Sequence, residues 1–161
     1  MIQRFSPNYN WTTLLKVFQC ARLSAVHLLE EEFRKRTGHQ EAIAFLYGRS
    51  GLYFLLKCIN KPGAEVVLPS DTCVVVAHSI VLAGYKPIFL DNAKNSRQPS
   101  YDQYLAALNE NTVMVIPTHL YGIPQETKEL FFQIKSLRPD IFVLQDCAHS
   151  FFCKEDRKSV V

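Results

Sequence analysis

Apolar residues recur along this chain in two different patterns. Between residues 12 and 36 they return at roughly helical spacing, which predicts one helix that ends near Gly38. From residue 42 onward, short apolar runs typical of buried strands alternate with amphipathic segments long enough for short helices. The runs are 42–47, 66–68, 87–90, 113–116 and 141–144, and the segments between them are 49–60, 72–83, 101–109 and 125–136.

This alternation predicts an α/β fold. Strands that alternate with helices require crossover connections, which give a mainly parallel sheet with helices on both faces, in three α/β/α layers. The nearly continuous apolar character of the runs agrees, because such strands are buried on both sides. No internal repeat, linker or composition shift divides the chain, so we expect residues 1–161 to belong to a single domain.

Composition and charge exclude several classes of protein. The chain has 161 residues, of which 48% are hydrophobic and 20% charged, as in folded globular domains. A net charge of +3 is too small for a nucleic-acid-binding surface, and residues 34–36 form a basic run suited to a helix C-terminus. No apolar stretch is long enough to span a membrane, and the N-terminus does not resemble a signal peptide. With an odd and scattered set of 5 cysteines, we expect reduced thiols and a cytoplasmic location.

Polar residues gather after the predicted strands. They occupy residues 48–51, 69–73, 117–122 and 145–150. In an open parallel sheet, ligands bind at the carboxyl ends of the strands. Helix capping would supply some of these Ser, Thr and Asp residues, but their concentration at one edge favours a ligand site there.

The turn Gly48-Arg49-Ser50-Gly51 leads directly into a predicted helix. Backbone N–H groups at a helix N-terminus attract anions, and glycines allow a phosphate to approach the backbone closely. The turn matches neither a Walker loop nor a GxGxxG fingerprint. By itself it indicates a phosphate site or an ordinary strand-to-helix turn.

Asp146 follows the apolar run 141–144. A carboxylate there is partly desolvated and calls for a cationic partner, such as a protonated heterocyclic nitrogen. His149 can reach the same crevice. The alternative is that Asp146 caps a following turn while His149 lies on the surface. Cys147, His149 and Cys153 are close in sequence but lack the spacing of a zinc site, so we expect no metal.

The order of these segments resembles that of the DegT/DnrJ/EryC1/StrS family of sugar aminotransferases, from residue 28 to residue 158. The similar segments are LLEEEFRKRTGHQEAIAFLYGRSGLYFLL, GAEVVLPSDTCVVVAHSIVLAGYKPIFLD, TVMVIPTHLYGIP and FVLQDCAHSF. The resemblance implies the aspartate aminotransferase fold and pyridoxal 5'-phosphate as cofactor.

The resemblance also implies roles for cofactor-binding residues. The backbone N–H groups of Arg49 and Ser50 would hold the cofactor phosphate. Asp146 would pair with the protonated pyridine nitrogen, which keeps the ring an electron sink. His149 would lie near the phenolic oxygen, and Cys73 would lie over the ring face, where many relatives have an aromatic residue.

On the substrate side the resemblance is less detailed. It places His119 and Tyr121 near the substrate mouth. In the family, a lysine well downstream of the aspartate carries the cofactor as a Schiff base and moves the proton. Lys154 and Lys158 do not match it, so no catalytic residue is identified within the sequence. We therefore expect residues 1–161 to correspond to an incomplete large domain without the C-terminal small domain, inactive by itself.

The function implied is amino transfer from a glutamate-like amino acid to a keto sugar, often nucleotide-linked, as in amino sugar biosynthesis, by a homo-oligomer. Two alternatives stay open. One is a non-catalytic remnant that binds the cofactor or docks on a partner. The other is an unrelated Rossmann-like enzyme that uses Asp146 and His149 as an acid–base pair.

Overall fold

The computed structural model describes residues 10–12, 15, 24–122 and 126–150. The chain divides into two compact units, Met1–Ala44 and Phe45–Val161, which are described separately below. No helix in these described ranges is both long enough and apolar enough to cross a bilayer.

The first unit contains helix α2, Ser24–Thr37. Ion pairs one turn apart join Glu31 to Lys35 at 3.0 Å and Glu32 to Arg36 at 2.6 Å. The helix is followed by Gly38, whose backbone has φ +76° and whose N–H donates to the carbonyl of Arg34 at 2.8 Å. A glycine in this conformation is a common helix stop. The predicted helix is confirmed over this range, and residues 16–23 of it lie outside the described residues.

The second unit alternates helices and strands. Its elements are α3 (Gly48–Ile59), β1 (Glu65–Pro69), α4 (Val74–Ala83), β2 (Lys86–Leu90), α5 (Tyr101–Ala106), β3 (Thr112–Val115), α6 (Lys128–Leu137) and β4 (Phe142–Val143). The strands form one 4-stranded sheet in the order β2-β1-β3-β4, and every neighbouring pair is parallel. The predicted α/β class and parallel sheet are confirmed.

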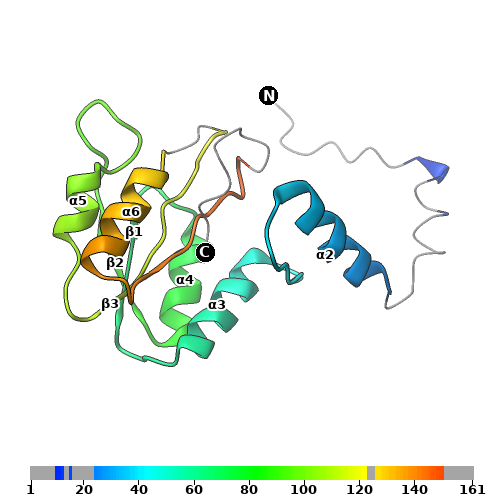
Figure 1. The fold of residues 1–161 in the computed structure, drawn as a ribbon, viewed down its shortest axis with the longest axis horizontal. Coiled ribbons are helices and arrows are strands. Elements are labelled where there is room, and N and C mark those ends of the chain that lie inside the picture. Colours follow the sequence, from blue (N-terminus) through cyan, green and yellow to red (C-terminus); the bar gives the residue numbers. More distant parts are fainter. Residues whose placement is uncertain (1–9, 13–14, 16–23, 123–125, 151–161) are drawn as a thin grey trace. The chain divides into compact units, whose positions relative to one another are not determined.

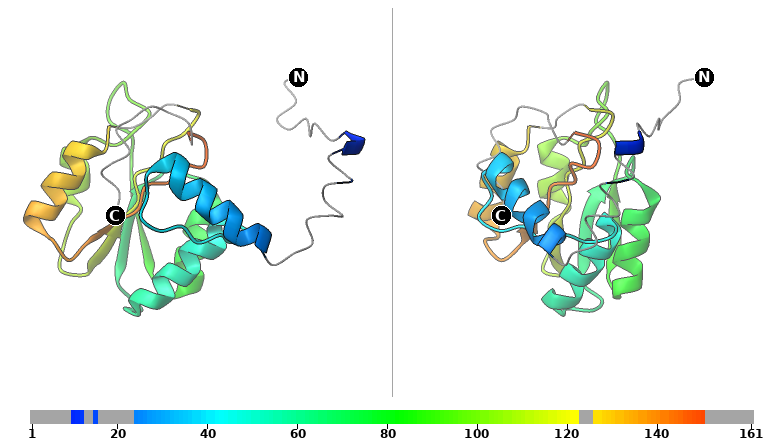
Figure 2. Two further views of the ribbon diagram at one scale, coloured as in Figure 1. Left: turned by 45° about the vertical axis from the view of Figure 1, so that its right-hand side comes forward. Right: turned by 90° about the vertical axis from the view of Figure 1, so that its right-hand side faces the viewer.

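Helices cover both faces of this sheet. Because successive strand residues face opposite sides, Val66 and Leu68 of β1 pack with α3 and α4, whereas Val67 packs with α5 and α6. Figure 1 shows the two helix pairs on either side of the strands, and Figure 2 shows the same layers from two further directions. The second unit therefore has the three layers that the sequence pattern predicts.

The apolar run 42–47 is not a strand, contrary to the sequence-based prediction. Its backbone pairs with no strand of the described sheet, and Ile43 and Leu46 are 75% and 94% exposed. A strand requires a hydrogen-bonded neighbour for its N–H and C=O groups. Within the described residues this run has no neighbouring strand, so its apolar pattern alone does not produce a strand.

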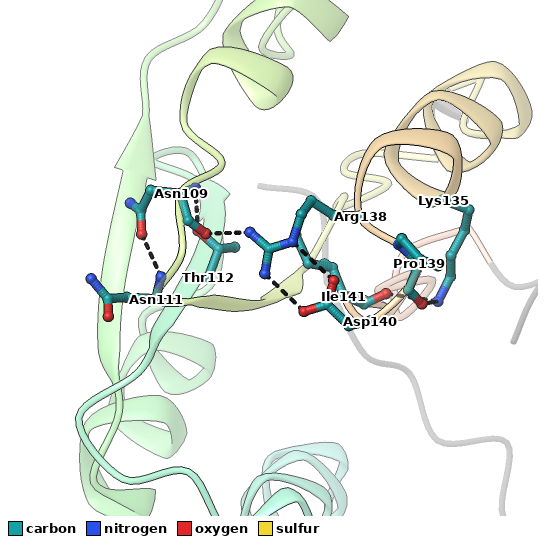
Figure 3. Close-up of polar contacts among 8 residues, drawn as sticks. All are labelled: Asn109, Asn111, Thr112, Lys135, Arg138, Pro139, Asp140 and Ile141. Carbon is teal, nitrogen blue, oxygen red and sulfur yellow. Dashed lines mark hydrogen bonds and ion pairs between the residues drawn. The ribbon is translucent and has the colours of Figure 1, made fainter.

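A polar clamp fixes the edge of the sheet at which the strands begin (Figure 3). The Arg138 guanidinium donates to the carbonyl of Asn109 at 2.7 Å and forms two hydrogen bonds with the Asp140 carboxylate, at 2.9 and 2.8 Å. Lys135 donates to the carbonyl of Ile141 at 2.7 Å. These contacts join the segment before β4 to the segment before β3, and thereby set where both strands start.

Candidate active site

Beyond β3 and β4 the chain segments remain side by side. The backbone N–H of Asp146 donates to the carbonyl of Pro117, and the N–H of His119 donates to the carbonyl of Asp146, both at 2.9 Å. These bonds make a parallel bridge between Thr118 and Asp146. Asp146 thus lies at the carboxyl edge of the sheet, where the sequence predicts a ligand site.

The Asp146 side chain is half-buried. One carboxylate oxygen accepts a hydrogen bond from the N–H of Ala148 at 3.1 Å, as in a capped turn. Among the described residues no lysine, arginine or histidine forms an ion pair with it. A half-buried carboxylate with spare acceptor capacity is suited to a ligand that presents a cationic N–H group.

The neighbours of Asp146 in sequence take different positions. Gln145, for which the sequence suggests no role, donates a side-chain hydrogen bond to the hydroxyl of Thr127 at the start of α6. His149 is exposed, on the turn that follows Asp146. The capped turn at Asp146 and the exposed His149 match the alternative that the sequence leaves open, so a ligand contact of Asp146 stays a prediction.

His119 is buried, with only 3% of its surface exposed. Burial lowers the pKa of its imidazole, and the nearby Asp146 charge opposes this effect. A neutral imidazole is therefore favoured at neutral pH. The family resemblance implies a place for His119 near the substrate mouth, whereas the structure gives it little solvent access. A contact with substrate stays a prediction.

Tyr121 is exposed and belongs to a cluster of three side chains on three loops. Its ring centroid lies 6.4 Å from that of His149, and the guanidinium carbon of Arg97 lies 5.6 Å from the Tyr121 ring centroid. Tyr121 has φ +57° and Gly122 has φ +75°, so the loop turns sharply after β3. We call Arg97, Tyr121 and His149 the rim cluster.

The predicted phosphate turn begins helix α3. The helix has Tyr47 as its N-cap residue, without a side-chain cap. The N–H of Ser50 donates to the carbonyl of Tyr47 at 2.9 Å, while the N–H groups of Gly48 and Arg49 have no acceptor among the described residues. Open N–H groups at a helix start can bind an anion. The backbone N–H of Arg49 and the hydroxyl of Ser50 are therefore suitable donors for a phosphate.

Gly51 lies close to an aromatic ring in this turn. A Cβ atom at Gly51 would lie 3.0 Å from the Phe45 ring, which is closer than ordinary contact. The Arg49 guanidinium lies 4.3 Å from the Tyr47 ring centroid, in cation–π contact. The turn thus contacts the aromatic residues that precede it, and Gly48 and Arg49 are exposed.

The end of β1 also reaches the site. The hydroxyl oxygens of Thr72 and Thr118 lie 3.3 Å apart, which joins the loops after β1 and β3. Cys73 follows as the exposed N-cap residue of α4, with a free thiol. Among the described residues, no group of His, Cys, Asp and Glu side chains is arranged for a metal ion, and Cys153 lies outside them.

The structure thus brings together some of the sequence-predicted residues. The backbone N–H of His119 donates to the carbonyl of Asp146, and the rings of Tyr121 and His149 are in contact. We expect the start of α3 at the same edge, because α3 is followed by a short turn and then by the beginning of β1. The distance between Ser50 and Asp146 stays a prediction. Sequence reasoning missed Arg97 and Gln98, which lie in a polar loop without any recognisable motif.

Solved structures share this fold. A putative sugar aminotransferase from Streptococcus pneumoniae in its PLP form has a TM-score of 0.76 and 20% identity, over 86% of this chain and 40% of that one. The aminotransferase TlmJ from Streptoalloteichus hindustanus has a TM-score of 0.78 and 23% identity, over 94% and 43%. For 3-amino-5-hydroxybenzoic acid synthase the TM-score is 0.79 and the identity 21%, over 90% and 40%. The chain therefore spans less than half the length of these structures.

A family model extends the likeness from fold to sequence. It describes the DegT/DnrJ/EryC1/StrS aminotransferase family and matches residues 11–160, which include every segment that forms the sheet edge described above. The match agrees with the resemblance seen in the motifs and leaves no support for an unrelated Rossmann-like enzyme. The chain belongs to the DegT/DnrJ/EryC1/StrS aminotransferase family.

Proposed function

We propose that this chain binds pyridoxal 5'-phosphate at the carboxyl edge of its sheet, as part of an aminotransferase that acts on a keto sugar. The observation that carries the proposal is Asp146, a half-buried carboxylate with no cationic partner among the described residues. Family membership and the PLP form of the Streptococcus pneumoniae structure support it.

The residues present fit the cofactor. Its phosphate suits the open N–H groups at the start of α3, with the backbone of Arg49 and the hydroxyl of Ser50 as donors. Asp146 would accept the pyridine N–H and keep the proton on that nitrogen. When bound, the cofactor serves as an electron sink that stabilises negative charge at the amino acid α-carbon.

The remaining residues have supporting roles in this proposal. His149 would lie beside the phenolic oxygen of the cofactor, and Cys73 over the ring face. A thiol covers less of a ring than an aromatic side chain, so the cofactor would be held more loosely than by an aromatic residue. Buried His119 would keep the Asp146 segment in place through its backbone hydrogen bond.

We propose a glutamate-like amino acid as amino donor and a keto sugar, often nucleotide-linked, as acceptor. The family description supports amino transfer, and the name of the Streptococcus pneumoniae protein supports a sugar. The lysine that would carry the cofactor is not assigned within residues 1–161. A homo-oligomer and a cytoplasmic location remain predictions.

Cofactor binding is tested by titrating pyridoxal 5'-phosphate into the chain and following its absorbance. We expect saturable binding that Asp146→Asn weakens at least about tenfold, because loss of a charge-assisted hydrogen bond typically has this effect. The matched control is Asp102→Asn, which removes an exposed carboxylate on α5 and should leave binding unchanged. Equal affinity for both variants would overturn the assignment of Asp146.

The same samples separate an enzyme from a non-catalytic cofactor-binding protein. After borohydride reduction, mass spectrometry locates any lysine bonded to the cofactor. We expect sparse labelling of surface amines and no amino transfer by residues 1–161 alone. Stoichiometric labelling of Lys154 or Lys158 together with turnover of glutamate and a keto sugar would show that the catalytic lysine lies within this chain.

A further inference from the structure

We infer that Arg97 is a specificity-determining residue that binds the diphosphate of a nucleotide-linked acceptor at the rim of the site. The inference rests on the proposed function, since that function supplies the acceptor. Sequence motifs do not single out Arg97. Its position over the Tyr121 ring, which itself lies near the His149 ring, is what brings it into the site.

A hydrogen-bonded turn holds Arg97 in place. The N–H of Ala93 donates to the carbonyl of Gln98 at 3.0 Å, and the N–H of Ser96 donates to the carbonyl of Ala93 at 2.9 Å. The Gln98 side chain donates to the carbonyl of Thr118 at 2.9 Å. Because Thr118 forms the bridge with Asp146, this turn is fastened to the segment that carries the proposed cofactor aspartate.

The guanidinium of Arg97 is available to a ligand. It lies over the Tyr121 ring, and among the described residues it has no carboxylate partner. A guanidinium that rests on an aromatic ring keeps its N–H donors at its edge, where they match the paired oxygens of a phosphate. The site therefore presents a positioned anion-binding group to solvent.

The exposure of the rim cluster favours a diphosphate over an amino acid carboxylate. Arg97, Tyr121 and His149 are all exposed, whereas Asp146 is half-buried. The α-carboxylate of an amino donor is bonded to the reacting carbon and must stay near the cofactor. The diphosphate of a nucleotide sugar is separated from the reacting carbon by the sugar ring, so it suits a group at the solvent rim.

The test is an NMR titration of the chain, without cofactor, with inorganic pyrophosphate, with uridine diphosphate and with glutamate. We expect saturable shifts with both phosphate probes and none with glutamate. Arg97→Gln should lower the affinity for both phosphate probes about tenfold, as expected for loss of a charge-assisted hydrogen bond. Lys94→Gln removes one positive charge from the same exposed loop and serves as the matched control. It should change the affinity for the two phosphate probes less than about twofold.

The outcomes separate this inference from the proposed function. Pyridoxal phosphate affinity should be the same in the wild-type chain and in Arg97→Gln, because Arg97 is not among the proposed cofactor contacts. An equal loss of affinity for the phosphate probes in Arg97→Gln and Lys94→Gln would overturn the inference. Chemical-shift changes with glutamate that Arg97→Gln abolishes would overturn it as well. Failure of the wild-type chain to bind pyridoxal phosphate would reject the proposed function, while the pyrophosphate titration would still decide the role of Arg97.

Discussion

Two aspartates near β4 show how partners decide the state of a carboxylate. Asp140, before the strand, is paired with Arg138, and this hydrogen bond lowers the pKa of Asp140 from its usual 3.8 to about 2. Asp146, after the strand, has a backbone hydrogen bond and no cationic partner among the described residues. The first carboxylate is already satisfied within the fold, whereas the second is open to a ligand.

The Asp140 pair predicts a pH dependence of stability. Since the pKa is lower in the folded than in the unfolded chain, the pair stabilises the fold fully above about pH 4. That contribution is lost as the pH falls toward 2, where the folded carboxylate binds its proton. Urea unfolding between pH 2 and pH 5 should show a smaller loss for Asp140→Asn than for the wild-type chain. If the free energy of unfolding depended on pH in the same way in both proteins, the Arg138–Asp140 pair would not contribute to stability.

At the scale of elements, apolar runs predict strands only where a neighbour exists. The runs 66–68, 87–90, 113–116 and 141–144 all become strands, because each lies beside another in the sheet. The run 42–47 has the same composition but no partner among the described residues. A sequence pattern reports burial preference, while pairing depends on distant segments.

In the candidate site, too, features set by local sequence could be predicted, whereas features set by contacts between distant segments could not. Asp146 and the α3 turn could be predicted, because strand ends and helix starts are fixed by local patterns. The position of Arg97 could not be predicted, because it depends on the hydrogen bond from Gln98 to Thr118, which joins two loops distant in sequence. The burial of His119 could not be predicted either, because burial depends on how segments distant in sequence pack together.

Helix α4 allows a matched test of the packing between helix and sheet. Ile80 is fully buried against the sheet, whereas Leu82 on the same helix is 73% exposed. We expect Ile80→Ala to lower the free energy of unfolding by about 2–5 kcal/mol through lost burial and a residual cavity. Leu82→Ala should change it by less than about 0.5 kcal/mol. Similar losses in the two variants, measured by urea denaturation, would contradict the packing.

At the scale of the whole molecule, large apolar side chains remain on the surface. Val74, Val81 and Leu82 of α4 are exposed by 60%, 58% and 73%, and Phe54 of α3 by 54%. Strands β2 and β4 are the edges of the described sheet, with backbone groups on their outer sides unpaired by another described strand. Both features favour association with other chains.

We therefore expect the purified chain to self-associate. Light scattering should show a mean mass that rises with protein concentration, because exposed apolar surface and open strand edges are buried on contact. Leu82→Gln should reduce the effect, since it replaces an exposed apolar side chain with a polar one. A concentration-independent monomer would contradict the prediction.

The bridge between Thr118 and Asp146 has an entropic consequence. It places the Asp146 carboxylate on backbone already ordered by the sheet, so binding of a ligand there would not have to immobilise a loop. For a cationic ligand, the free energy of binding at Asp146 would then reflect the balance between desolvation and hydrogen bonding, with little conformational loss. Such a carboxylate is preorganised: its orientation is a property of the folded chain before any ligand arrives.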